Sequence, residues 1–104
     1  MLIIFNTDHT ISATDEFKAP MIASLSEKLK KYSHQITKID VHLSDENGSK
    51  GGPKDKRCLL EAHMAGMNPT VVKNHDSNYD DALDGAIDKL MSSLEKELGH
   101  LKNH

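Results

Sequence analysis

The sequence has 104 residues, of which 37% are hydrophobic and 28% are charged, and its formal net charge is −3. This composition predicts a single globular domain over residues 1–104, and the net charge argues against indiscriminate binding to nucleic acid. The apolar run at residues 1–5 is too short for the apolar part of a signal peptide or for a membrane span. A lone cysteine, Cys58, cannot form an internal disulfide, which favours a reducing cytoplasm.

The first predicted elements are a strand at residues 2–7, where an apolar run ends in polar residues, and then a helix. The helix is indicated by apolar residues at steps of three or four: Phe17, Met21, Leu25, Leu29 and Tyr32. Thr14 or Asp15 is expected to cap its start. Because Pro20 lacks an amide donor, either the regular helix begins near Ala19 or its first turn is distorted.

Three further strands are predicted to pair as an antiparallel meander. In residues 35–44 two faces alternate, with Thr37, Ile39, Val41 and Leu43 on one, and Ile36, Lys38, Asp40 and His42 on the other. The segment RCLLEAHMAG, residues 57–66, places on one side Cys58, Leu60, Ala62 and Met64. A turn in GMNP, residues 66–69, then leads to the last strand at residues 70–75.

A long helix is predicted for the rest of the chain from an apolar stripe over many turns. The stripe consists of Ala82, Leu83, Ala86, Ile87, Leu90, Leu94, Leu98 and Leu101. Asp76 or Ser77 is the predicted cap, and Asp80, Asp81 and Asp84 suit the positive end of the helix dipole. The order is therefore β-α-β-β-β-α, which predicts an α+β fold with two helices packed on one face of a four-stranded sheet.

The glycine-rich loop at residues 44–58 does not fit a phosphate-binding loop, because GSKGGPKDK lacks the Gly-Lys-Ser/Thr ending and leads into a strand. Seven histidines raise the hypothesis of a small metal-dependent enzyme, in which His42 and His63 are cross-strand neighbours. No further ligands with the usual spacing accompany them, so solvated or partner-facing histidines are the favoured interpretation and no metal site is expected. Cys58 is predicted to be a buried core residue. No active site is indicated, and no cofactor is expected.

Charge is distributed unevenly along the chain. Five lysines and one glutamate lie between Lys18 and Lys38, whereas seven carboxylates and three lysines lie from Asp76 onward. Such segregation can steer a polyanion to one face, and ordinary solvated helix surfaces are the alternative explanation. The candidate contacts to phosphates of structured RNA are Lys28, Lys30, Lys31, Lys50, Lys54, Lys56, Arg57, Lys89 and Lys96.

Three segments carry a resemblance to a known family: LSEKLKKY at residues 25–32, ALDGAIDKL at residues 82–90 and HLKNH at residues 100–104. With the element order and length, they make nearly the whole chain similar to the ribosome hibernation-promoting factors, also called ribosome-associated inhibitor, protein Y or sigma-54 modulation proteins. The loop at residues 43–58 resembles that of a divergent branch of short members. The family's fold is itself similar to the double-stranded-RNA-binding domain.

The resemblance implies a cytoplasmic, non-enzymatic factor of stationary or stressed cells that binds rRNA of the small ribosomal subunit. It implies occupation of the channel for messenger and transfer RNA, and hence translation inhibition, with contacts from Lys28, Lys31, Lys89 and Lys96. Neither a membrane nor DNA is an expected partner, and the dimerisation domain of long members is not expected.

The last helix departs from the family pattern. Asp80 stands at the family's tyrosine position, and Ser92 stands where an arginine is usual. Glu95 and Glu97 add further negative charge, which opposes binding to phosphates. The alternative function is therefore a regulatory protein-interaction module that kept the fold with a degraded RNA-binding face.

Overall fold

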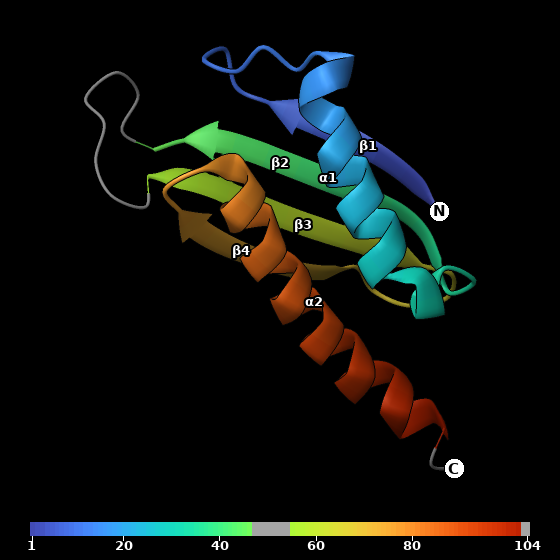
Figure 1. Cartoon of the computed structure of the whole chain (residues 1–104). Coiled ribbons are helices and arrows are strands. Elements are labelled where there is room, and N and C mark those ends of the chain that lie inside the picture. The colour runs from blue at the N-terminus through green and yellow to red at the C-terminus, as the bar shows by residue number, and fades with distance from the viewer. Residues whose placement is uncertain (47–54, 103–104) are drawn as a thin grey trace.

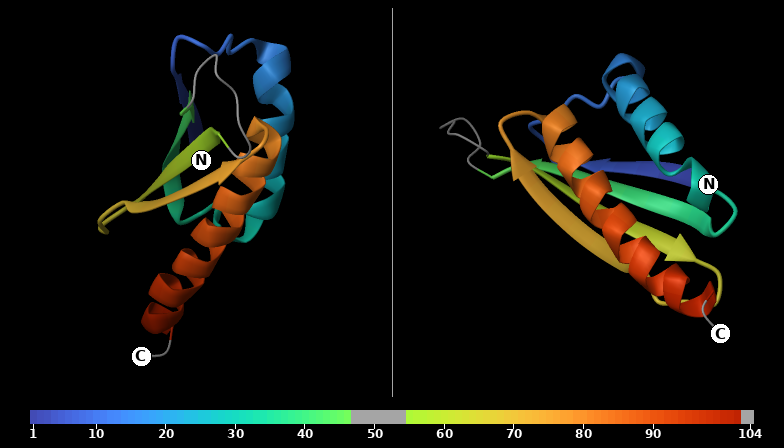
Figure 2. Two further views of the ribbon diagram at one scale, coloured as in Figure 1. Left: turned by 90° about the vertical axis from the view of Figure 1, so that its left-hand side faces the viewer. Right: turned by 60° about the horizontal axis from the view of Figure 1, so that its bottom comes forward.

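The computed structural model describes residues 1–46 and 55–102. Its elements are β1 (Leu2–Thr7), α1 (Asp15–Lys28), the 3-10 helix η1 (Lys30–Tyr32), β2 (Ile36–Asp45), β3 (Lys56–Met64), β4 (Thr70–Asp76) and α2 (Tyr79–Lys102). The strands form one sheet in the order β1-β2-β3-β4, with β1 parallel to β2 and the other neighbours antiparallel. Both helices cover the same face of this sheet (Figure 1 and Figure 2). The predicted element order, meander and one-sided helix layer are confirmed.

The hydrophobic core lies between the sheet and the two helices. Alternate residues of β3 point into it, and the predicted inward set is buried throughout: Cys58, Leu60, Ala62 and Met64. The stripe of α2 is likewise buried at Ala82, Leu83, Ala86, Ile87, Leu90 and Leu94. Leu98 is partly buried against the core, and the side chain of Leu101 lies outside the described residues. Apolar spacing thus predicted the core correctly in both elements.

The start of β2 differs from the predicted alternation. Ile36 is buried and Thr37 is exposed, although Thr37 was predicted to share the face of Ile39. The cause is a shift in the pairing of β2 with β3 between Ile36 and Lys38, because an extra residue in one strand inverts the faces beyond it. Thr37 Oγ1 instead donates a hydrogen bond to the carbonyl oxygen of His63 at 3.0 Å. From Ile39 onward the predicted inward face is confirmed.

The start of α1 agrees with one of the two predicted caps. Thr14 is the N-cap, and its hydroxyl accepts a hydrogen bond from the Phe17 amide at 3.1 Å. The regular helix begins at Asp15 and contains Pro20, so a start near Ala19 is wrong.

The cap of α2 is Asn78, and the prediction of Asp76 or Ser77 is wrong. Asn78 Oδ1 accepts a hydrogen bond from the Asp81 amide at 2.8 Å. Asp76 instead ends β4, and its carboxylate accepts a hydrogen bond from the Ser77 amide at 2.8 Å. The chain therefore uses two further residues to leave the strand before the helix begins.

Gly85 brings α2 close to β4. A Cβ atom at this position would lie 2.7 Å from Asn74 Cγ, which is closer than such atoms can approach. Asn74 Nδ2 donates a hydrogen bond to the carbonyl oxygen of Ala82 at 3.2 Å. The glycine thus leaves room for a polar link between helix and sheet.

Among the described residues, no helix combines the length and apolar character that a membrane span requires.

Candidate RNA-binding surface

Two of the predicted lysines bridge α1 and η1 to α2. Lys28 Nζ lies 3.2 Å from Asp84 Oδ1, and Lys31 Nζ lies 3.4 Å from Glu95 Oε1. The side chains of both pairs are between 40% and 63% exposed, so water and salt screen these attractions. The pKa of Lys31 is raised by its hydrogen bond to Tyr32 and by Glu95. Each of the two ammonium groups therefore already has a carboxylate partner.

The other helix lysines are less constrained. Lys30 and Lys96 are exposed, and neither forms an ion pair within the part of the chain that the structure describes. Lys89 is also exposed, and its Nζ donates a hydrogen bond to the Lys73 carbonyl oxygen of β4 at 2.9 Å. Lys89 and Lys96 are two turns apart on α2, so they project from the same side of the helix. The predicted lysines thus flank α2 on two sides.

The layer formed by the helices has a net negative charge. From Asp15 to Lys28, Lys30 to Tyr32 and Tyr79 to Gly99 there are nine carboxylates and six lysines, a difference of −3. The two helices run in roughly the same direction along the sheet, so their acidic amino ends share one end of the layer (Figure 1). The basic carboxyl end of α1 lies toward the other end. The acidic amino ends suit both helix dipoles, and the basic carboxyl end of α1 suits its own dipole, whereas the carboxyl half of α2 carries Glu95 and Glu97 beside Lys96.

The basic residues beside the glycine-rich loop are separate from the helix layer's lysines. Lys56 Nζ lies 3.0 Å from both Asp45 Oδ2 and Asp55 Oδ1, and its hydrogen bonds to these carboxylates raise its pKa. Asp55 is buried, so Lys56 supplies a hydrogen-bond partner to a carboxyl group that is shielded from water. Arg57 Nε lies 3.6 Å from Glu46 Oε1. Lys50 and Lys54 lie outside the described residues.

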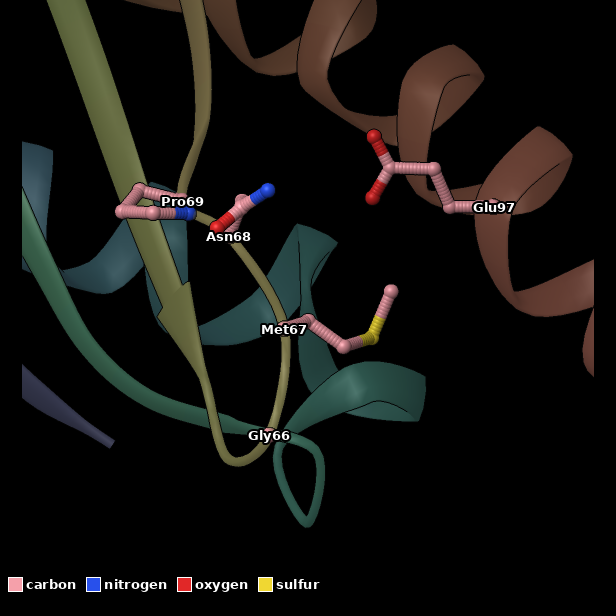
Figure 3. Close-up of a pocket in the computed structure, with 5 residues that line it drawn as sticks. All are labelled: Gly66, Met67, Asn68, Pro69 and Glu97. Atoms are coloured by element: carbon pink, nitrogen blue, oxygen red, sulfur yellow. The ribbon is translucent and has the colours of Figure 1, made fainter.

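A hollow of about 630 Å³ lies between the β3–β4 turn and α2 (Figure 3). It is lined by Gly66, Met67, Asn68, Pro69 and Glu97. The carboxylate of Glu97 accepts hydrogen bonds from the Thr70 hydroxyl at 2.9 and 3.1 Å. Sequence reasoning missed this hollow, because it forms only where the turn and the distant helix meet. Among the described residues that line the hollow, Glu97 is the sole titratable group, so they offer one carboxylate without a partner for acid–base chemistry.

The predicted pairing of His42 with His63 is wrong. In the register of β2 and β3, His42 is opposite Leu59, and His63 is opposite Lys38. The pairing direction is as predicted, but the two histidines lie four positions apart along the strands. His63 contacts Asp40 and Glu61 instead, on the sheet face that the helices leave open.

Comparison with known proteins gives one family and several similar structures. The model of the family described as Sigma 54 modulation protein / S30EA ribosomal protein matches residues 4–102. The N-terminal domain of Thermus thermophilus Protein Y is 20% identical with a TM-score of 0.72, covering 92% of this chain and 98% of that chain. A ribosomal subunit interface protein from Coxiella burnetii is 14% identical with a TM-score of 0.72, covering 95% of this chain and 99% of that chain. A search of curated proteins found no match. At these identities the structural matches establish the fold.

Proposed function

Because this chain belongs to the family of the Sigma 54 modulation protein and S30EA ribosomal protein, we propose that it is a ribosome-associated hibernation factor. The family match over residues 4–102 carries this proposal, and it agrees with the resemblance found in the sequence. In the finer proposal, residues 1–104 act as one domain in the cytoplasm of stressed cells. The domain binds small-subunit rRNA in the channel for messenger and transfer RNA. It inhibits translation by occlusion, without catalysis.

Exposed lysines of the helix layer support rRNA contact through phosphates. Lys30, Lys89 and Lys96 can turn toward a polyanion without breaking an ion pair among the described residues. Lys28 and Lys31 must exchange a carboxylate for a phosphate, which is feasible because their ion pairs are exposed. Contact with phosphates releases counterions from RNA, so the proposed binding weakens as salt rises. At Lys28 and Lys31 this release is offset in the wild type, because each displaced carboxylate attracts cations in turn.

The loop-side residues have different parts in this proposal. The ammonium group of Lys56 is held between two carboxylates, so we assign it to the fold rather than to the rRNA contact. Arg57 is in the same position as Lys28 and Lys31, because it must exchange a carboxylate, that of Glu46, for a phosphate. Lys50 and Lys54 remain in the proposed contact set as a basic supplement to the acidic last helix.

Co-sedimentation with purified small subunits over a salt series tests this function. The wild-type chain should bind at low salt and dissociate as salt rises. A variant with Lys28, Lys31, Lys89 and Lys96 changed to glutamine should bind more weakly, with a flatter salt dependence. Lys73→Gln is the matched control, because Lys73 is an exposed lysine of β4 outside the helix layer. Absence of wild-type binding at low salt would refute the proposal.

The acidic helix ends favour a second candidate, a protein-interaction module. A hollow of about 350 Å³ between the amino-terminal parts of α1 and α2 is lined by Glu16 and Asp80 and by the aromatic rings of Phe17 and Tyr79. Carboxylates and aromatic rings together suit the side chain of a basic protein. Recovery of a basic protein in a pull-down, without ribosomes or rRNA, would favour this candidate over the first.

A further inference from the structure

Three metal-ligating side chains meet on the open face of the sheet, opposite the helices. Asp40 comes from β2, and Glu61 and His63 come from β3. His63 Nε2 lies 3.1 Å from Asp40 Oδ2 and 3.6 Å from Glu61 Oε2. One ligand atom from each of the three residues lies within 4.8 Å of the other two. The cluster is therefore compact, and it stands on two strands that are hydrogen-bonded to each other.

The register of the sheet brings two carboxylates face to face in this cluster, which favours binding of a cation. Asp40 and Glu61 are directly opposite each other, and like charges in this relation are unfavourable. Other carboxylates of the paired strands are placed differently: Asp45 and Asp76 are both opposite Lys56. The facing pair of Asp40 and Glu61 is thus an exception to the charge matching found nearby. A cation between these two carboxylates removes their repulsion.

The distances agree with those between ligands of a single metal ion. Ligand atoms about 2.0–2.1 Å from a tetrahedral zinc ion are about 3.4 Å from one another. The two distances from His63 Nε2 to the carboxylate oxygens, 3.1 and 3.6 Å, lie on either side of this value. One imidazole nitrogen with two carboxylate oxygens is also a donor set that zinc and neighbouring transition metals accept.

We propose that Asp40, Glu61 and His63 bind a divalent transition-metal ion, with Zn²⁺ as the ion to test. The side chains of these residues are 15%, 28% and 30% exposed, so the site is held in place by its surroundings and still open to solvent. The remaining coordination position is left for water. The site lies on the face opposite the helix lysines, so it is independent of the proposed rRNA contact.

The ammonium group of Lys38 competes with the metal ion for the carboxylate of Asp40. Lys38 Nζ lies 3.5 Å from Asp40 Oδ2, and the lysine side chain is 38% exposed, so it can turn into solvent when a metal arrives. In the metal-free protein, the ammonium group of Lys38 supplies positive charge beside Asp40. Removing the lysine charge should therefore strengthen metal binding, whereas a cluster that serves only as an ion-pair network should not take up metal when Lys38 is removed.

Isothermal titration calorimetry of the tag-free full chain with ZnCl₂ tests the site. The wild type should bind one ion saturably, and His63→Gln and Glu61→Gln should each weaken binding by about tenfold or more. Lys38→Gln should bind more tightly than the wild type. His75→Gln is the matched control and should bind as the wild type does. His75 also contacts a carboxylate, with Nε2 3.2 Å from Glu46 Oε1, but no third ligand completes its site among the described residues.

Thermal melting and circular dichroism complete the test of the metal site. Zn²⁺ should raise the melting temperature of the wild type more than that of His63→Gln, because a bound ion links β2 to β3. Circular dichroism checks that each variant is folded before its binding is compared. The proposal is overturned if the wild type shows no saturable binding, or if His63→Gln and Glu61→Gln both bind Zn²⁺ as tightly as the wild type.

Discussion

Carboxylates of α2 hold two of the proposed rRNA-binding lysines, and their removal should strengthen binding to the small subunit. The double variant Asp84→Asn and Glu95→Gln releases Lys28 and Lys31 from ion pairs of 3.2 and 3.4 Å. A freed lysine that contacts a phosphate adds about 0.7–0.9 to the slope of log affinity against log salt concentration. Two freed lysines should therefore steepen this slope by about 1.5. Over a fourfold change in salt, from about 50 to 200 mM, the affinity gain should be about eightfold larger at the lower concentration.

The assay is co-sedimentation of the fluorescently labelled chain with small subunits at several KCl concentrations. The matched control is Glu27→Gln with Asp88→Asn, which changes the net charge of the two helices by the same amount. Within the described part of the chain, neither Glu27 nor Asp88 forms an ion pair. Equal steepening in both double variants would show that only net charge matters. An unchanged slope in both would refute the assignment of Lys28 and Lys31 to the rRNA contact.

Three further predictions concern stability and reactivity. Burial raises the pKa of the Cys58 thiol from 9.0 to about 12, so Ellman's reagent at pH 8 should label the native chain about a thousandfold more slowly than the unfolded chain. Asn78→Ala should lower the free energy of unfolding by about 1 kcal/mol in urea titrations, whereas Ser77→Ala should have little effect. Hydrogen bonds from the Thr10 hydroxyl and the Asp45 amide lower the pKa of Asp8, so its carboxylate stabilises the fold above its unfolded pKa. That contribution is lost as pH falls through the lowered value, so the difference in urea midpoint between wild type and Asp8→Asn should be constant above about pH 5 and shrink as the pH falls below it.

The fold was predictable from sequence because apolar spacing determines which faces are buried. Buried residues occur at every second position of β3, at Cys58, Leu60 and Ala62, as in any half-buried strand. Buried residues of α2 recur every three or four positions, as in any amphipathic helix. Thr37 was misplaced because the prediction assumed strict alternation, whereas the added residue in β2 places Ile36 and Ile39, three residues apart, on the same buried face. The cap at Asn78 was missed because several adjacent residues have capping side chains, and the end of β4 selects among them.

The site was less predictable than the fold. The sequence identifies the candidate lysines, but the partners of these side chains depend on how the two helices face each other. Lys28 and Asp84 are 56 residues apart, and their contact exists only after α1 and α2 have packed side by side. The cluster around His63 likewise depends on strand register, which a one-residue shift changes. The prediction paired His63 with His42, which lies four positions along β2 from Lys38, the residue that His63 faces.

The parallel pairing of β1 has a consequence for how the molecule opens. β1 pairs with β2 alone, through a connection that contains α1, whereas β2, β3, β4 and α2 follow one another along the chain. None of the six residues of β1 is fully buried, and Leu2 is 59% exposed. Segments with few buried contacts open at lower free energy than the core does. Amide hydrogen exchange should therefore report a lower free energy of opening for β1 than for β3. The first strand can then detach while the meander and α2 stay folded.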